Sequence, residues 1–464
     1  MSKSGSRSVR RTYSLLNLRD WSIPLGVLTA LLVLIFATGG TSRYDTPHIM
    51  LLRPAAILAA GFALISFTSE HWRAYRPLLL LALASLVLTA LHLMPLPPGV
   101  WQSLPGREII AEIDQVAGLE GQWRPLSMFP EGTWNALYAM SVPLAALLLA
   151  AQLNEKDRVR LLALVILLCL VSGMVGVLQA AGTDVRFYRV SSETAGLFAN
   201  RNHQAAMLGA MFPMIAALAL CASAYTKHTR PVRLVAATGM IALVPLIMVT
   251  GSRMGLVVGL IGFSCLIFMR FSRDAGGKGF ALSGAMQAGA GALIAAGMAA
   301  GSVFLARDKA LDRMAAGTEN EMRMPVWESM LEFIPQYMPW GSGIGSFVPI
   351  YQIHEPPTLL IPGYFNQAHN DWIDIALTSG IPGAVLTLAA LIMFALGAKS
   401  ALAARGVAGH LRKCGIIVIL VLAFASLSDY PLRTPILSAL FAIAAVWAWS
   451  PETDNTHKRK PEAS

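Results

Sequence analysis

Charged side chains are scarce in this chain of 464 residues, at 13% of the sequence, while 55% of the residues are hydrophobic. Soluble domains carry about 25% charged residues, so a soluble globular fold is excluded. Cysteine is also scarce: the four cysteines form no C-x-x-C pair, which argues against disulfide bonds and metal–thiolate sites. No H-E-x-x-H or similar ligand spacing is present, so we expect neither a metal nor a cofactor.

Much of the sequence consists of long apolar runs. They recur along the chain at about 17–22 residues each, close to the length at which a helix crosses a bilayer. The runs are continuous rather than alternating, which excludes a transmembrane β-barrel. We therefore predict an all-α polytopic membrane protein with about twelve transmembrane helices. The predicted spans are 23–38, 50–67, 78–94, 134–152, 161–181, 204–225, 234–249, 254–269, 281–305, 381–398, 414–426 and 435–449.

Basic residues predict the orientation of these spans. The segment before the first span is rich in Lys and Arg, which favours a cytoplasmic N-terminus. Alternating crossings then place most other Lys and Arg residues, and the C-terminus, on the same side. The net charge of +10 therefore reflects topology, and we expect membrane lipids rather than nucleic acid around the protein. No clear small-x-small cleavage site follows the run 23–38, so we expect a retained helix and not a signal peptide.

The composition divides the chain into four parts. We predict a cytoplasmic basic tail at 1–22, an N-terminal transmembrane region of about five helices at 23–195, and a second transmembrane region at 196–449. The second region includes a large outward-facing loop at 306–380, between the ninth and tenth predicted helices. Residues 450–464 form a cytoplasmic tail. Long loops inside compact domains tend to be functional, so the chemistry is expected first in this loop.

Unusual polar residues gather in four segments that this topology places on the outward side. Because all four segments face one compartment at a similar membrane depth, they indicate a shared site. The segments are 196–203, 250–253, 307–379 and 428–433.

Each segment carries an arginine, namely Arg201, Arg253, Arg323 and Arg433. The planar guanidinium fork suits phosphate and carboxylate groups, and outward arginines run against the positive-inside tendency. We predict that Arg253, Arg323 and Arg201 bind an anionic headgroup, with Arg433 as a supporting residue. The alternative is that these side chains lie along the membrane interface or form loop ion pairs.

His369 is the predicted catalytic base, because an imidazole titrates near neutral pH and can take a proton from an attacking hydroxyl group. Asn370 and Asp371 follow it directly and can orient its ring or bind sugar, and Asn202 is a further supporting candidate. An ordinary surface histidine is the alternative.

Two other features of the large loop have a functional and a structural interpretation. Gly341, Gly343 and Gly345 can form tight turns, or can present backbone N–H groups to phosphate. Tyr351 and Trp372 can stack on a sugar, although aromatic rings at this depth normally form the interfacial belt.

The ordered set of motifs resembles the bacterial O-antigen ligase and O-antigen polymerase superfamily, over about 196–449. The motifs are Gly196-Leu-Phe-Ala-Asn-Arg-Asn-His203, Ser252-Arg253, Arg323-Met-Pro-Val-Trp327, Gly341-Ser-Gly-Ile-Gly-Ser-Phe347, and His369-Asn370 followed by Gly380-Ile-Pro-Gly383.

The resemblance implies a multi-pass glycosyltransferase of the bacterial inner membrane, with its active site on the periplasmic side. The donor would be a glycan on undecaprenyl pyrophosphate, and the acceptor lipid A–core in ligases or another lipid-linked repeat unit in polymerases. The family's essential histidine corresponds to His369, and its phosphate-binding arginines to Arg253, Arg323 and, less closely, Arg201. Many members have His-x-His-Asn where this chain has Gln367-Ala-His369-Asn370, which leaves one candidate base there.

Two functions other than that of a ligase stay open. A repeat-unit polymerase shares all of these features, and the sequence alone does not separate the two acceptors. A transporter for a lipid-linked glycan is the alternative of another class. Transporters usually place ionisable residues near the bilayer midplane, whereas here they gather outside the spans, which favours the enzyme.

Overall fold

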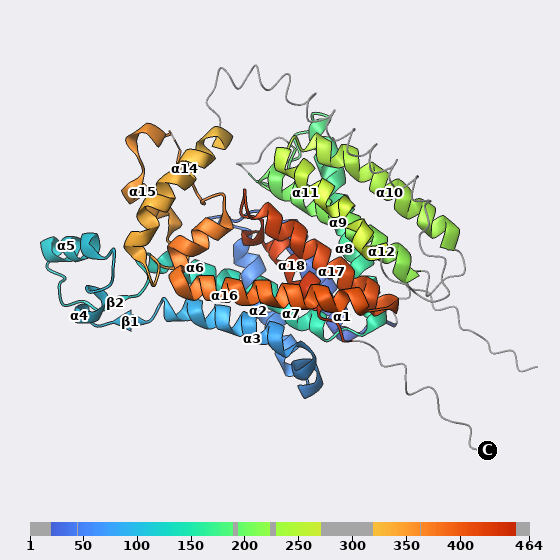
Figure 1. Cartoon of the computed structure of the whole chain (residues 1–464), viewed down its shortest axis with the longest axis horizontal. Helices are drawn as coiled ribbons and strands as arrows, with labels where there is room; N and C mark the ends of the chain where they lie inside the picture. Colours follow the sequence, from blue (N-terminus) through green and yellow to red (C-terminus); the bar gives the residue numbers. More distant parts are fainter. Residues whose placement is uncertain are drawn as a thin grey trace, which may run out of the picture.

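The protein is a bundle of apolar helices with a smaller helical unit at one end (Figure 1). The computed structural model describes residues 20–43, 45–188, 194–222, 229–270, 319–361 and 363–451. The helices of eight residues or more are α1 (Ile23–Thr38), α2 (Ile49–Ile65), α3 (Ser69–Leu91), α5 (Glu108–Ala117), α6 (Pro130–Ala139), α7 (Ser141–Ala151), α8 (Glu155–Ala180), α9 (Arg201–Ala222), α10 (Thr229–Val249), α11 (Arg253–Ser264), α14 (Glu319–Phe333), α15 (Phe347–His354), α16 (Asp371–Ala403), α17 (Gly406–Ala425) and α18 (Pro435–Ala448).

The prediction of an all-α membrane protein is confirmed within the described residues. Seven apolar helices are long enough to cross a bilayer, and four shorter ones, Ile23–Thr38, Ile49–Ile65, Arg253–Met269 and Pro435–Ala448, accompany them. These eleven helices coincide with predicted spans, and the first has the predicted bounds. The ninth predicted span, at 281–305, lies outside the described residues, so the total of twelve stays a prediction.

Helix α9 lies at the centre of the bundle and packs against α8, α10, α11 and α17. It is apolar and buried on nearly all sides, as expected of a helix enclosed by others. A Cβ atom added at Gly262 of α11 would lie 2.4 Å from the carbonyl oxygen of Gly209. The backbones of α9 and α11 therefore approach closely through glycine, as small residues allow in membrane bundles.

The large predicted loop is folded where the structure describes it. Helices α14 and α15, with the short 3₁₀ helices η2 (Ile334–Tyr337) and η3 (Pro357–Leu359), lie at one end of the bundle. Their buried side chains, among them Met330, Phe347 and Tyr351, form a hydrophobic core separate from that of the bundle. We call residues 93–129 and 319–370 together the head unit.

Residues 93–129 complete the head unit. They contain the hairpin of β1 (Pro95–Leu96) and β2 (Arg124–Pro125), the short helix α4 (Pro98–Trp101), and α5. Buried Arg107 donates hydrogen bonds to the carbonyl oxygens of Leu126 (2.7 Å) and Gly341 (2.9 Å). This arginine therefore joins the two sequence-distant halves of the head unit.

Helix α16 is broken at Gly380, where the backbone adopts φ +55° and ψ −146°. The break separates a short segment, Asp371–Ser379, from the apolar part that was predicted to start at residue 381. A Cβ at Gly380 would lie 2.2 Å from the carbonyl oxygen of Pro339, so only glycine fits at this crossing. The first two turns of α16 are thereby fixed against the head unit, directly after His369.

Candidate active site

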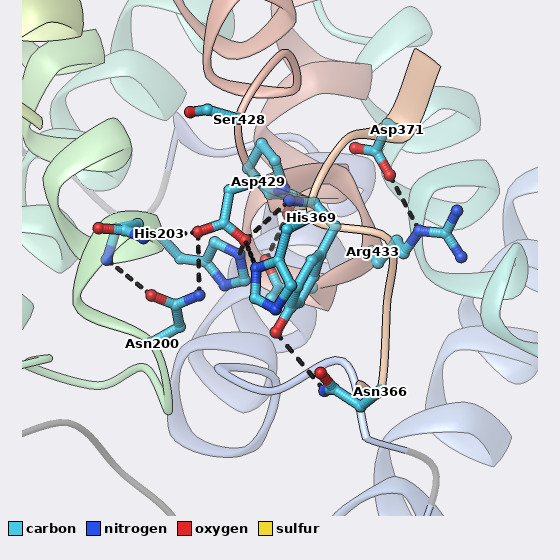
Figure 2. Close-up of polar contacts among 12 residues, drawn as sticks. Asn200, His203, Asn366, His369, Asp371, Ser428, Asp429 and Arg433 are labelled. Carbon is cyan, nitrogen blue, oxygen red and sulfur yellow. Dashed lines mark hydrogen bonds and ion pairs between the residues drawn. The ribbon is translucent and has the colours of Figure 1, made fainter. Parts of the chain in front are cut away.

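Asp429, in the connection between α17 and α18, lies at the centre of the polar cluster, and the residue is 2% exposed (Figure 2). Its Oδ2 atom accepts hydrogen bonds from the side-chain amides of Asn200 (3.1 Å) and Asn202 (2.7 Å). The Ser252 hydroxyl donates in turn to Oδ1 of Asn202 at 2.7 Å. Three segments that are distant in sequence are therefore joined around one carboxylate.

Three helices begin at this cluster, and polar side chains cap their N-termini. The Oδ1 of Asn200 accepts from the N–H of Asn202 at the start of α9, and the Ser252 hydroxyl accepts from the N–H of Gly255 in α11. The Asn370 side chain accepts from the N–H groups of Trp372 and Ile373 in α16. These residue types are favoured at N-caps. Helix N-termini carry partial positive charge, so their convergence favours an anionic ligand.

His369 faces Asp429, as Figure 2 shows, with its Nδ1 atom 3.3 Å from the carboxylate Oδ1. His203, on the first turn of α9, approaches the same oxygen, with Nε2 at 3.5 Å. The ring of Tyr430 makes edge-to-face contacts with both imidazoles, at centroid distances of 4.8 Å and 5.0 Å. Neither imidazole reaches hydrogen-bond geometry, but catalytic contacts are often long in unliganded enzymes.

The environment of Asp429 keeps its carboxyl group ionised. Burial alone raises the pKa of the group, but the charges of the two nearby imidazoles outweigh burial and hold that pKa well below its usual range. An ionised carboxylate against Nδ1 of His369 fixes the ring orientation and leaves Nε2 to face a substrate. This arrangement suits a general base.

The three arginines predicted to bind an anion differ in their exposure and in their contacts with this cluster. Arg323, on α14, donates to the carbonyl oxygen of Ser428 at 2.7 Å, and its Nη2 lies 3.8 Å from Asp429 Oδ2. Arg253 is the first residue of α11, directly after Ser252, and its side chain is exposed. Arg201 is partly buried at the first position of α9. Arg323 thus contacts the cluster directly, while Arg201 and Arg253 adjoin its members Asn202 and Ser252 along the chain.

Arg433 is engaged with two carboxylates. Its Nε lies 2.9 Å from Asp371 Oδ1, and its Nη2 lies 2.7 Å from Asp374 Oδ1. Both acids belong to the first turn of α16, so this ion-paired cluster ties the connection after Asp429 to the helix that follows His369. Two of the predicted supporting residues, Arg433 and Asp371, therefore form an ion pair with each other.

The glycine run in the head unit has a structural use. The N–H groups of Ser342 and Gly343 donate to the carbonyl oxygens of Leu377 and Thr378, both at 2.9 Å, and that of Ile344 donates to His92 Nδ1 at 3.1 Å. These N–H groups are therefore committed within the protein, which favours the turn interpretation over phosphate binding.

The two aromatic candidates differ in exposure. Tyr351 is 1% exposed and stacks on Phe347, so neither face of its ring is open to a sugar. Trp372 is partly buried.

Asp429 and His203 were not among the predicted site residues, although both lie in the polar segments that the sequence singled out. The unusual feature was an acid in a short connection between two apolar spans. Among the described residues, no group of three or more His, Cys, Asp or Glu side chains has the geometry to hold a metal ion.

Comparison with known proteins assigns the family of this region. Residues 238–388 match the family model for O-antigen ligase, which confirms the resemblance predicted from the motifs. The matched range contains Arg253, Arg323 and His369, while Asp429 and His203 lie outside it. No curated protein matches the chain. The chain is thus a polytopic membrane protein with a domain of the O-antigen ligase superfamily.

Proposed function

We propose that this protein is an O-antigen ligase-type glycosyltransferase of the bacterial inner membrane. It would transfer a glycan from undecaprenyl pyrophosphate to an acceptor hydroxyl group, of lipid A–core or a similar molecule, on the periplasmic face. The observation that carries this proposal is the contact between His369 Nδ1 and the buried Asp429 carboxylate, at 3.3 Å. It supplies an oriented base within the family's domain.

The surroundings of the base support a pyrophosphate-linked donor. Exposed Arg253 and partly buried Arg323 and Arg201 provide guanidinium groups, which bind phosphate oxygens in pairs. The N-termini of α9, α11 and α16 add partial positive charge on the same side. As the sugar–phosphate bond breaks, negative charge grows on the pyrophosphate, and fixed positive groups stabilise that charge.

The chemical step needs no covalent intermediate. The acceptor oxygen attacks the anomeric carbon while His369 Nε2 takes its proton, and the bond to pyrophosphate breaks with the electron pair leaving on the phosphate oxygen. The configuration at the anomeric carbon inverts. The resulting imidazolium is balanced by Asp429. A positioned base contributes roughly 10²–10⁴-fold to the rate.

Replacement of the base tests this mechanism. His369→Ala should lower transfer in proteoliposomes by about 10²-fold or more, with normal insertion and thermal unfolding. His71→Ala is a matched control, since His71 lies at the start of α3 and pairs with Thr68. Retained activity in His369→Ala would overturn the assignment of the base.

A repeat-unit polymerase is the other candidate, because the same donor chemistry serves both. A deletion strain separates them when surface glycan and lipid A–core are analysed together. Undecaprenyl-linked long chains beside unmodified core indicate a ligase, whereas single repeat units without long polymer indicate a polymerase. Normal glycan of every type would contradict both.

A further inference from the structure

His203 and His369 share one carboxylate oxygen, although only His369 has a place in the proposed reaction. Their nitrogens lie 3.5 Å and 3.3 Å from Asp429 Oδ1. His203 is 2% exposed, and its ring lies between the edges of Phe198 and Tyr430. His203 is therefore a buried titratable side chain beside the carboxylate that pairs with the proposed base, and the proposed reaction gives it no role.

The charge of the cluster limits how many protons it can hold. One carboxylate balances one imidazolium, and its other oxygen is already occupied by Asn200 and Asn202. The two facing imidazole nitrogens are at most about 7 Å apart, because each lies within 3.5 Å of the same oxygen. Protons on both rings would therefore repel each other through a largely buried region.

The other polar groups around the two rings do not relieve this repulsion. Arg323 adds a further positive charge beside Asp429, and Tyr430 contributes its ring edge and a backbone N–H group that donates to Oδ1. Arg433, on the far side, is matched by two carboxylates. Asp429 is the carboxylate that contacts both imidazoles.

We propose that His203 is a positioning residue that competes with His369 for the charge of Asp429 and thereby sets how the rate of transfer depends on pH. This inference rests on the proposed role of His369 as the base. When His203 holds the proton, His369 can still accept the proton of the acceptor hydroxyl, but as a weaker base, because the charge of Asp429 is already balanced. Coupled groups of this kind titrate as one unit.

The direction of the effect follows from the coupling. If His203 is replaced by a residue that cannot become charged, Asp429 acts on His369 alone, and His369 binds a proton at higher pH. At about 7 Å and an effective dielectric constant of about 20, the repulsion of two unit charges corresponds to roughly one to two pH units.

The test is the pH dependence of transfer in proteoliposomes by wild type and His203→Gln, whose amide can still donate to Asp429. We expect the acid limb of the rate to move to higher pH by about one unit in His203→Gln, so that the rate falls more at pH 6 than at pH 8. Phe198→Leu is the matched control, because it disturbs packing against His203 without removing a titratable group. Its acid limb should stay at the wild-type position.

An unchanged acid limb in His203→Gln, or an equal shift in Phe198→Leu, would overturn the proposal. If His203→Gln does not insert, ¹⁵N-histidine NMR of the wild-type protein and of His369→Gln gives the second measurement. The pH dependence of the His203 ring signals should differ between the two proteins. The same pH dependence in both would overturn the proposal, while failure of the base itself appears separately, as activity retained in His369→Ala.

Discussion

Trp327 donates its indole N–H to the backbone carbonyl oxygen of Ala368 across 2.7 Å. Trp327 lies one turn after Arg323 on α14, and Ala368 directly precedes His369, so one hydrogen bond joins the arginine helix to the histidine loop. His369 has φ +52°, in a region that residues other than glycine seldom adopt. Such a conformation costs about 1–3 kcal/mol and persists where the surroundings enforce it.

Trp327→Phe tests this restraint, because it removes the donor and keeps most of the ring packing. We expect the rate of transfer to fall by up to about 10-fold, as the loss of one net hydrogen bond allows, with little change in donor KM. Trp123→Phe is the control, since Trp123 is 62% exposed in the head unit. Equal rates for both variants would show that the bond does not position His369.

Asp429→Asn keeps the size of the side chain and removes its charge. The imidazolium formed in the reaction then lacks a balancing carboxylate, and we expect transfer to fall by about 10²-fold or more. Asp184→Asn, at a 98% exposed carboxylate, should retain wild-type activity. Initial rates at saturating acceptor give the comparison, and a loss below 10-fold would contradict the pairing of Asp429 with His369.

The stability that the charge of Asp429 contributes should be lost in strong acid. Its pKa is lower in the folded protein than in the unfolded chain, where it is about 3.9, so the ionised form stabilises the fold above that value. This stabilisation is lost as the pH falls through the folded-state pKa. The difference in melting temperature between wild type and Asp429→Asn should therefore be retained at pH 6 and shrink below about pH 4. A difference that already shrinks at pH 6 would refute this.

Arg253→Lys keeps a positive charge but loses the planar fork that binds two phosphate oxygens. We expect the donor KM to rise about 10-fold, and more in Arg253→Ala, with a smaller effect on acceptor KM. Arg43→Lys is the control, because Arg43 already pairs with Asp45 in an exposed ion pair. An unchanged donor KM in Arg253→Ala would exclude this arginine from the pyrophosphate site.

Gly343→Ala should destabilise the protein. The residue has φ +118°, and an added Cβ would lie 2.2 Å from the Ser127 hydroxyl oxygen, so strain and overlap combine. The backbone conformation alone costs about 1–3 kcal/mol. Gly99→Ala, where an added Cβ meets nothing within 4 Å, should change the melting temperature little. Similar melting temperatures for both variants would argue against a structural role for the glycine run.

Most membrane helices could be predicted because a segment that crosses a bilayer must be long and apolar, and this property can be recognised within each segment alone. The first span, at 23–38, was predicted with its observed bounds. The head unit was harder to predict. Its two halves are joined by contacts between residues more than a hundred positions apart, such as the hydrogen bond from Arg107 to Gly341, and such pairings leave no periodic signal in either segment.

The sequence by itself determined the class of protein, its apolar helices and the set of polar segments, because hydrophobicity and charge act on each segment separately. It also pointed to Arg201, Arg253, Arg323 and His369, whose catalytic and binding roles stay predictions. Only the tertiary structure decided which residues meet. The contact between Asp429 and His203 could be seen only in the structure, where the starts of α9, α11 and α16 converge on one buried carboxylate. An ion pair exists only once the chain brings its partners within a few ångströms.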